Sequence, residues 1–301
     1  MKIIFFGNTR FSLIGAKIIH SKFGLSQIVT LPDRPDKKGR PTPNPLKSFA
    51  IENNIPYLLV DKITHETIET ISDLNPDFLI VEDYGLLLPD ALLKLPKYES
   101  LNIHHSLLPK YRGTSPAPFA ILSGDKITGV TVIAMNDKVD AGDILAQKEY
   151  EIKPTDTTES LLTELNKLGG GIILPVLKDY IDGVAHPIKQ DESKASYTER
   201  MSKSDGQIDI NNPPDKDKLD RMIRAYYPWP GVWTTLSVKG KALRVKFLPK
   251  PLSLRGIEED EAIPSNYLIQ PEGGKPMSVK DFLNGYPEMR ELLRDLFFLV
   301  G

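Results

Sequence analysis

The sequence contains no cysteine, and this absence excludes several kinds of site at once. Disulfide scaffolds, thiolate zinc centres, iron–sulfur clusters and cysteine nucleophiles all require a thiol group. The absence also fits a reducing compartment. The apolar run at residues 3–6 ends at Gly7, which is too early for a signal peptide. We therefore expect a cytoplasmic protein.

Long hydrophobic runs and an excess of one charge are also missing. No apolar run approaches the ~20 residues that a membrane-spanning helix needs, so we expect no membrane contact. The 38 basic and 40 acidic residues leave a formal net charge of −2, so any nucleic-acid contact would have to use a local basic patch. The 301 residues suffice for one large or two ordinary domains, and we expect a monomer.

The first part of the chain, residues 1–187, alternates between short apolar runs and segments with helical spacing. Strands are expected at 2–6, 26–31, 55–60, 77–81, 100–104, 129–135 and 144–152. Helices are expected at 11–22, 45–53, 64–74, 91–95 and 157–181. This alternation predicts an α/β fold with a mostly parallel sheet and helices on both faces. The last two strands are close in sequence, which predicts an antiparallel turn at a sheet edge.

The pattern of the sequence changes after this alternating part. Residues 188–203 are polar with little periodicity and predict a linker. Beyond them, helical spacing at 216–226 is followed by short strands near 233–238, 243–248 and 267–270 and by a C-terminal helix. We therefore predict a large domain at 1–187, a linker at 188–203 and a smaller β-rich domain at 204–301.

Glycine-rich phosphate-binding motifs are missing from the strand–helix junctions. The junction at 7–11 (Gly-Asn-Thr-Arg-Phe) does not have the G-x-G-x-x-G pattern of dinucleotide-binding loops. The three glycines at 169–171 lie inside a helical pattern, which indicates close packing of that helix rather than phosphate binding.

Two polar side chains stand at the end of the strand expected at 100–104. Because side chains alternate along a strand, Asn102 and His104 share one face and Ile103 points to the other. Ligands of open α/β sheets bind beyond the carboxyl ends of the strands. An amide donor beside an imidazole suits the stabilisation of a developing oxyanion. The alternative is that the two side chains only satisfy each other's hydrogen bonds.

A loop with three carboxylates follows the strand expected at 129–135. Asp137, Asp140 or Asp143 could hold the His104 imidazole in a productive tautomer or raise its pKa. Taken alone, the loop is better explained by ordinary turn chemistry, because Asp and Gly are common turn residues. No histidine or further carboxylate has convincing spacing for metal ligands, so no metal is expected.

A proline-rich segment at 32–47 concentrates basic side chains. Arg34, Lys37, Lys38 and Arg40 belong to it. Such a segment is typical of an extended arm that contacts phosphate groups. The alternative is a solvated loop without a partner.

In combination, these motifs are far more specific than each one alone. Asn102 and His104, the run Ser-Leu-Leu-Pro-Lys-Tyr-Arg-Gly at 106–113 and Asp140 in Val-Asp-Ala-Gly-Asp resemble the 10-formyltetrahydrofolate-dependent formyltransferases. That family has an Asn–His–Asp catalytic set on a Rossmann-like domain. The resemblance therefore implies that Asn102 and His104 donate hydrogen bonds to the oxyanion. It also implies that Asp140 orients and stabilises His104.

The resemblance covers nearly the whole chain. It includes the segments 3–7, 32–35, 84–85, 129–131, 205–209 and 224–231. Within the family, the chain is most similar to members that formylate initiator methionyl-tRNA, because these carry an OB-like C-terminal barrel after the catalytic domain. The resemblance thus implies formyl transfer from 10-formyltetrahydrofolate to the free amino group of initiator methionyl-tRNA, without a metal.

Further residues acquire roles through this resemblance. The residues implied in folate binding are Tyr84, Gly85, Ser106, Leu107, Leu108 and Pro109. The basic segment at 34–47 falls where these enzymes carry a loop that contacts tRNA. The chain departs from the family at Glu82 and Asp83, which replace an apolar or small pair close to the expected position of the pterin ring.

Three other functions remain open at this level. A sugar-nucleotide N-formyltransferase uses the same Asn–His–Asp chemistry on another acceptor. A formyltetrahydrofolate hydrolase uses water as the acceptor. A non-catalytic RNA- or folate-binding protein would retain binding alone. The basic segment favours tRNA, and the complete Asn–His–Asp set argues against the non-catalytic alternative.

Overall fold

The computed structural model describes residues 1–35, 39–250 and 267–297. The contacts within the chain divide it into two compact units. Unit 1 comprises residues 1–116, 127–151 and 162–198, and unit 2 comprises 117–126, 152–161 and 199–301. The domain boundaries that we expect from the sequence stay a prediction.

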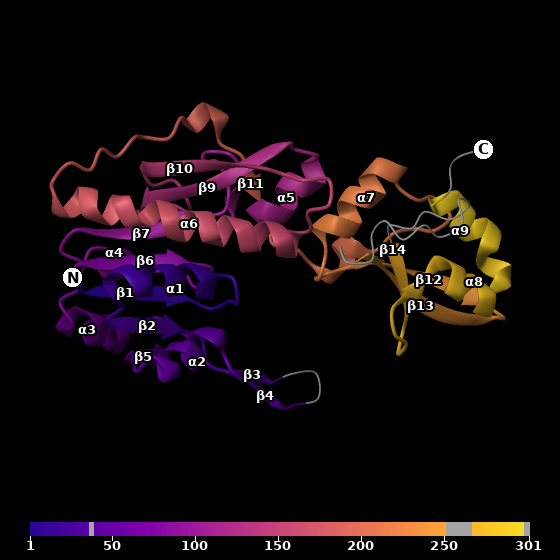
Figure 1. Ribbon diagram of the computed structural model, residues 1–301, viewed down its shortest axis with the longest axis horizontal. Helices are drawn as coiled ribbons and strands as arrows, with labels where there is room; N and C mark the ends of the chain where they lie inside the picture. The colour runs from indigo at the N-terminus through magenta and orange to yellow at the C-terminus, as the bar shows by residue number, and fades with distance from the viewer. Residues whose placement is uncertain (36–38, 251–266, 298–301) are drawn as a thin grey trace. The chain divides into compact units, whose positions relative to one another are not determined.

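Unit 1 is built on a seven-stranded sheet with the order β10-β9-β7-β6-β1-β2-β5 (Figure 1). The strands are β1 (Ile3–Gly7), β2 (Gln27–Thr30), β5 (Tyr57–Leu59), β6 (Phe78–Glu82), β7 (Glu99–His104), β9 (Ile127–Ala134) and β10 (Ile144–Glu151). Five adjacent strands, β5, β2, β1, β6 and β7, run parallel to one another. Strand β9 runs antiparallel to β7, and β10 runs antiparallel to β9 at the edge. The predictions of a mostly parallel sheet and of an antiparallel edge are confirmed.

Helices cover both faces of this sheet. One face packs against α1 (Ser12–Phe23), α2 (Pro45–Glu52) and α6 (Thr158–Ile181). The other packs against α3 (His65–Asp73) and α4 (Asp90–Leu93). Strand β1 shows the alternation that produces this arrangement, since Ile3 and Phe5 belong to the first core and Ile4 and Phe6 to the second.

Two glycines of α6 allow a close approach to its neighbours. A Cβ on Gly169 would lie 2.4 Å from Cγ2 of Ile103, and one on Gly170 would lie 2.9 Å from Cδ1 of Ile18. A Cβ on Gly171 would meet nothing within 4 Å. The predicted close packing of this glycine run is confirmed at two of its three positions.

Short paired strands complete unit 1. Strand β3 (Arg34–Pro35) pairs with β4 (Pro41–Thr42). Strand β8 (Arg112–Gly113) pairs with β11 (Tyr197–Thr198), which follows the short 3-10 helix η1 (Glu192–Lys194) in the sequence. Part of the polar segment expected as a linker thus runs along unit 1, where β11 adds to β8.

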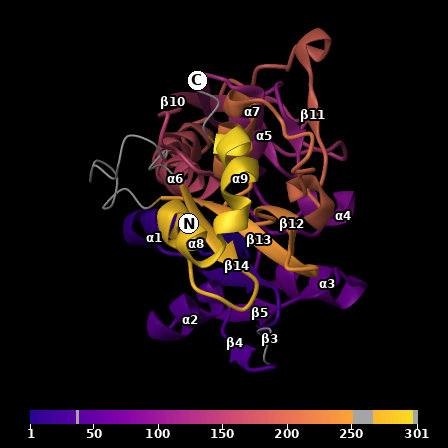
Figure 2. The same cartoon turned by 90° about the vertical axis from the view of Figure 1, so that its right-hand side faces the viewer.

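Unit 2 contains a four-stranded antiparallel sheet with the order β12-β13-β14-β15. Its elements are η2 (Lys203–Gly206), α7 (Lys216–Ala225), β12 (Val232–Val238), β13 (Lys241–Pro249), β14 (Tyr267–Pro271), β15 (Met277–Ser278), α8 (Val279–Gly285), η4 (Pro287–Met289) and α9 (Arg290–Phe297). Helices α7, α8 and α9 share one hydrophobic core with the sheet, and Figure 2 shows α8 and α9 lying over its strands. The prediction of a smaller β-rich C-terminal part is confirmed.

One helix is absent from our sequence-based expectations. Helix α5 (Pro116–Ser123) begins with two prolines, at 116 and 118, in a segment that reads as a proline-rich connector. Proline is compatible with the first helical turn, where the backbone N–H groups have no intrahelical acceptor. Among the residues that the structure describes, no helix combines the length and the hydrophobicity needed to cross a membrane.

Candidate active site

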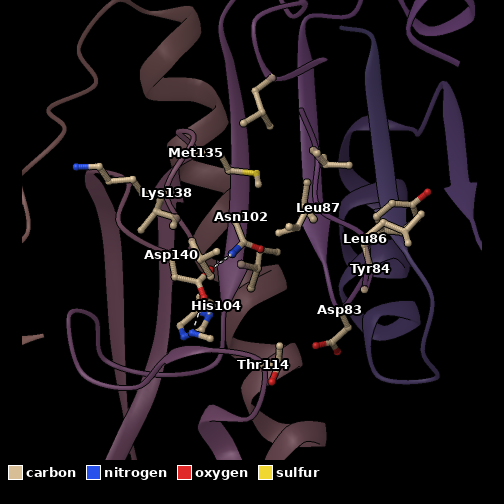
Figure 3. A pocket seen from close by; sticks show the side chains of 18 of the residues that line it. Asp83, Tyr84, Leu86, Leu87, Asn102, His104, Thr114, Met135, Lys138 and Asp140 are labelled. Carbon is tan, nitrogen blue, oxygen red and sulfur yellow. Dashed lines mark hydrogen bonds and ion pairs between the residues drawn. The ribbon is translucent and has the colours of Figure 1, made fainter. Parts of the chain in front are cut away.

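A pocket of about 920 Å³ opens at the carboxyl ends of β1, β6 and β7 (Figure 3). The lining includes residues 8–9, 61–63, 83–90, 102–105 and 135–140 of unit 1, together with Gly113 and Thr114. Open α/β sheets bind ligands at this edge, and the volume is typical of a small-molecule site.

Three of the predicted site residues meet in this pocket. The Asn102 amide donates a hydrogen bond of 3.1 Å to Oδ1 of Asp140. Nδ1 of His104 lies 3.5 Å from Oδ2 of the same carboxylate. The Gly113 backbone N–H also donates to that oxygen, at 2.7 Å. Figure 3 shows the three side chains facing one another across the end of β7.

The loop between β9 and β10 holds Asp140 in place by a tight reversal of the chain. Asp140 has a positive φ of 50°. A Cβ on Gly142 would lie only 1.7 Å from the Ala134 carbonyl oxygen, so this position requires glycine. Pairing of Asn102 with Ile133 in the β7–β9 ladder brings the end of β9, and thus this loop, beside β7.

His104 has a partner on each ring nitrogen. Nε2 lies 2.9 Å from the Tyr111 carbonyl oxygen, which can only accept, so Nε2 carries a hydrogen in this arrangement. Burial lowers the pKa of His104, and the nearby Asp140 carboxylate opposes this effect. The hydrogen that we expect His104 to donate to an oxyanion is therefore directed at Tyr111 here. Asn102 uses one of its two amide hydrogens on Asp140.

The next residue, His105, belongs to a second polar cluster. Its Nδ1 lies 3.4 Å from Oδ1 of Asp83, and its Nε2 lies 3.5 Å from Oε1 of Glu82. Asp83 also accepts a hydrogen bond of 3.2 Å from Thr9. Glu82 is fully buried. The sequence marks Glu82 and Asp83 as unusual for the family, but it contains no sign that His105 would lie between them.

The three groups of this second cluster strongly alter one another's protonation. Burial raises the pKa of Glu82 to about 8. Burial alone would lower the pKa of His105, but Asp83 and Glu82 outweigh it and raise this pKa to about 10. Burial opposes ionisation of Asp83, but His105 outweighs it and lowers the pKa of that carboxyl. At neutral pH the cluster therefore holds the His105 cation, the Asp83 anion and a largely protonated Glu82.

The residues expected to bind folate fall into two groups. Tyr84 and Gly85 line the pocket. Within the described part of the chain, residues 106–109 are not among those that line it. They follow β7 and are held by side chains of β9 and β10. The Ser106 carbonyl accepts a hydrogen bond from Thr131 at 2.6 Å, and the Leu108 carbonyl accepts one from Gln147 at 2.8 Å.

Apolar residues on the rim of the pocket are absent from our sequence-based list. Leu87 is 82% exposed and Val139 is 52% exposed, and both line the pocket with Met135. The only sequence signal is a run of three leucines, at 86–88, outside any strand or helix pattern. An exposed leucine beside a cavity gives it an apolar wall that suits a flat aromatic ligand.

The predicted basic arm is described only in part. Arg34 and Arg40 are exposed, whereas Lys37 and Lys38 lie outside the described residues. Strands β3 and β4 form the base of the arm, which extends from the sheet beside α2 (Figure 1). Asn44 anchors this base, because its side chain caps α2 and also donates to the Leu31 carbonyl at 3.1 Å.

Two family profiles match this chain, one in its first part and one in its second. Residues 1–177 match the sequence profile of the family described as Formyl transferase, and residues 200–254 match that of Formyl transferase, C-terminal domain. The methionyl-tRNA formyltransferase of Halothermothrix orenii is 36% identical over 275 residues, which are 89% of this chain and 85% of the relative.

Two solved structures share the fold. Methionyl-tRNA formyltransferase from Clostridium thermocellum has a TM-score of 0.60 at 16% identity, covering 92% of this chain and 99% of that one. An N-formyltransferase from Helicobacter canadensis, in complex with folinic acid and dTDP-3-aminofucose, has a TM-score of 0.58 at 19% identity, covering 92% and 97%. Given the family match and the relative from Halothermothrix orenii, the chain belongs to the formyl transferase family of enzymes.

Proposed function

We propose that the protein transfers the formyl group of 10-formyltetrahydrofolate to the free amino group of initiator methionyl-tRNA. The observation that carries this proposal is the convergence of Asn102, His104 and Asp140 on one pocket. The names of curated relatives support the acceptor, since methionyl-tRNA formyltransferases are similar over most of the chain. The folinic acid complex of a protein with this fold supports a folate donor.

The pocket is suited to a folate in both shape and polarity. Its rim is apolar at Leu87, Met135 and Val139, and Tyr84 and Gly85 continue this wall. The pterin ring would lie against this wall and direct the N10-formyl group towards Asn102. Residues 106–109, which follow β7, would contribute to folate binding indirectly, by fixing the turn after His104.

Amine attack on the formyl carbon creates the charge that Asn102 and His104 stabilise. The new C–N bond forms while the carbonyl electron pair moves to the oxygen. Asn102 donates its second amide hydrogen to this oxyanion. The Nε2–H of His104 turns from the Tyr111 carbonyl to donate another hydrogen bond, and the Asp140 carboxylate stabilises positive charge on the ring.

The attacking nitrogen must lose a proton, and the leaving N10 must gain one. Asp140 moves this proton from the ammonium group to N10, with His104 as its partner. The C–N10 bond then breaks, and tetrahydrofolate leaves with the proton. Hydrogen bonds from Asn102 and from the Gly113 N–H hold the Asp140 carboxylate in position for this transfer.

The basic arm would contact the acceptor rather than the folate. Arg34, Lys37, Lys38 and Arg40 would neutralise phosphate groups of the tRNA and hold its end near the pocket. An enzyme with this substrate acts where protein synthesis begins, so we also expect a cytoplasmic location, and we expect the monomer to be the active form.

A direct assay tests this function. Purified protein is incubated with 10-formyltetrahydrofolate and charged initiator methionyl-tRNA, with uncharged tRNA, an amino-sugar nucleotide and buffer alone in parallel. We expect formyl-methionyl-tRNA as the dominant product. Formylation of the sugar, or release of tetrahydrofolate without an acceptor, would move the protein to another reaction of the same family.

A substitution at the pocket tests the assignment of residues. Asn102→Ala removes one oxyanion donor, so turnover should fall ~100–1000-fold while the melting temperature changes little. Asn211→Ala, an exposed asparagine of unit 2, is the matched control and should keep full activity. An undiminished rate in Asn102→Ala would refute the proposed role of this amide.

A further inference from the structure

A segment far from β7 in the sequence lies against the loops of the candidate site. Residues 188–198, which we call the strap, pair with other segments of unit 1 at both ends. Ile188 forms a β-bridge with Ile144, with two hydrogen bonds of 2.8 Å. At the other end, β11 pairs with β8. The strap therefore spans the two loops that carry Asp140 and Gly113.

Gln190, the third residue of the strap, joins these two loops through one side chain. Its Nε2 donates to the Asp140 carbonyl at 2.8 Å and to the Gly142 carbonyl at 2.7 Å. Its Oε1 accepts from Nε and Nη2 of Arg112, at 3.1 and 2.8 Å. All of its donor and acceptor capacity towards the protein is thus directed at the loops around the pocket.

Arg112 makes this junction rigid. Its side chain is 1% exposed. Glu192 binds two of its guanidinium nitrogens, at 2.9 and 2.7 Å, and Tyr197 accepts at 3.2 Å. Planar, bidentate contacts of this kind fix the orientation of a guanidinium group. Arg112 therefore presents Gln190 with a fixed anchor.

These contacts close a ring that ends on the candidate catalytic carboxylate. Gln190 links the Asp140 backbone to Arg112, and Gly113 follows Arg112 directly. The Gly113 N–H in turn donates to Oδ2 of Asp140 at 2.7 Å. The same oxygen faces Nδ1 of His104 at 3.5 Å. A shift of Gln190 would therefore move both the backbone and the carboxylate of Asp140.

We propose that Gln190 is a positioning residue for Asp140, which holds that carboxylate at the correct distance from His104. This inference rests on the proposed function for the role of Asp140 in the reaction. The geometric part does not depend on the acceptor. It states that loss of the Gln190 side chain weakens the Asp140–His104 contact.

A measurement without substrate tests this geometric part. The charged or titratable groups that face His104 are Asp140, Asp83 and His105, and Asp140 is the main group that raises its pKa. Gln190→Met keeps the length of the side chain and removes its hydrogen bonds. We expect the pKa of His104, followed by NMR and assigned with His104→Gln, to fall, as it should in Asp140→Asn.

Controls separate this effect from a loss of structure. Lys189→Met changes the preceding, exposed residue of the strap and should leave the pKa of His104 unchanged. If Gln190→Met does not fold, Gln190→Ala provides the same comparison with a smaller side chain. A folded Gln190 variant with an unchanged pKa of His104 would overturn the proposal.

A double-mutant cycle then tests whether the effect reaches catalysis. Misplacement of a catalytic group by about 1 Å lowers rates up to about 100-fold, so Gln190→Met should lower kcat by about 10- to 100-fold with little change in the KM for the folate. In the Asp140→Asn background the same substitution should have almost no further effect.

The two proposals fail in different ways. Multiplicative losses in the cycle would show that Gln190 acts elsewhere and would overturn the positioning role. Full activity in Asp140→Asn would instead refute the proposed function of Asp140, while the pKa measurement would still decide whether Gln190 positions the carboxylate.

Discussion

His104 and His105 are adjacent and almost equally buried, with 6% and 4% of their side chains exposed. Their pKa values nevertheless move in opposite directions. Burial lowers the pKa of His104, whose ion-pair partner at 3.5 Å, Asp140, is also engaged by Asn102 and Gly113. His105 lies between two carboxylates, at 3.4 and 3.5 Å, and its pKa is raised to about 10.

The difference shows that burial alone does not determine the charge of an imidazole. The deciding factor is how many carboxylates face the ring and how far donors already engage them. A histidine whose pKa is lowered is not held as a cation, so it suits hydrogen-bond donation and proton exchange at a reacting group. A histidine held as a cation between a carboxylate and a protonated carboxyl group is suited to structural support. The two rings should therefore respond differently to substitution.

The largest expected effect separates the two histidines by stability. His105→Asn removes the cation between Glu82 and Asp83, and breaking a buried ion pair lowers the free energy of unfolding by about 3–5 kcal/mol. His104→Asn should cause a smaller loss of stability but a much larger loss of turnover. Denaturant unfolding and initial rates of both variants provide the comparison.

A double variant checks the cause of this destabilisation. Asp83→Asn in the His105→Asn background removes the carboxylate that has lost its cation, so it should recover part of the lost stability. Equal destabilisation by His104→Asn and His105→Asn would contradict the distinction between the two rings.

The second prediction concerns the pH dependence of stability. The pKa of Glu82 rises from 4.5 to about 8 on folding, and that of His105 rises from 6.5 to about 10. Both groups bind protons more tightly in the folded protein, so their stabilising contribution is present at low pH and is lost as pH rises. The Glu82 part is lost between 4.5 and 8, and the His105 part between 6.5 and 10.

Glu82→Gln isolates one of these two parts. The variant cannot titrate at this position, so wild type should lose more stability than the variant between pH 4.5 and 8. Each unit of pKa difference corresponds to about 1.4 kcal/mol. Thermal unfolding at a series of pH values measures the difference. A constant difference across this range would mean that Glu82 does not titrate there.

The third prediction concerns the core behind both histidines. Gly169→Ala places a Cβ 2.4 Å from Ile103, which directly precedes His104, and 3.6 Å from Oε1 of Glu82. Overpacking of this kind destabilises by about 1–3 kcal/mol. Because β7 must shift, turnover should fall as well.

The matched control lies two residues away on the same helix. Gly171→Ala meets nothing within 4 Å, so it should stabilise the helix by up to about 1 kcal/mol and leave turnover unchanged. Urea unfolding of both variants measures the contrast. Similar stability of the two alanine variants would show that the sheet accommodates the extra methyl group at 169.

The smallest effect is expected from the basic arm, whose substitution should not alter the surroundings of His104 and His105. Replacing Arg34 and Arg40 by alanine removes two exposed cations of the arm. The KM for tRNA should rise, and each lost phosphate contact should reduce the slope of log affinity against log salt by about 1. Lys178→Ala, on the exposed surface of α6, is the control. A change in kcat without a change in the salt dependence would contradict a role in phosphate contact.

Much of the fold follows from local patterns. Alternating strand and helix segments predict the sheet of unit 1, and short apolar runs make β1 and β6 readily recognisable. Helix α5 is not predicted, because its two prolines are typical of a connector. They are compatible with a helix only when they lie in its first turn. The β3–β4 and β8–β11 pairs also escape it, since two residues are too few for a recognisable pattern.

The candidate site divides in the same way. Alternation along β7 is sufficient to place Asn102 and His104 on one face, because side-chain direction in a strand depends only on the backbone. The tertiary structure alone decides that Asp140, 38 residues after Asn102, is the carboxylate that joins them. It also decides that Gln190 reaches the Asp140 backbone and that His105 lies between the carboxyl groups of Glu82 and Asp83. These features depend on distances between segments remote in sequence, and a local pattern carries no information about such distances.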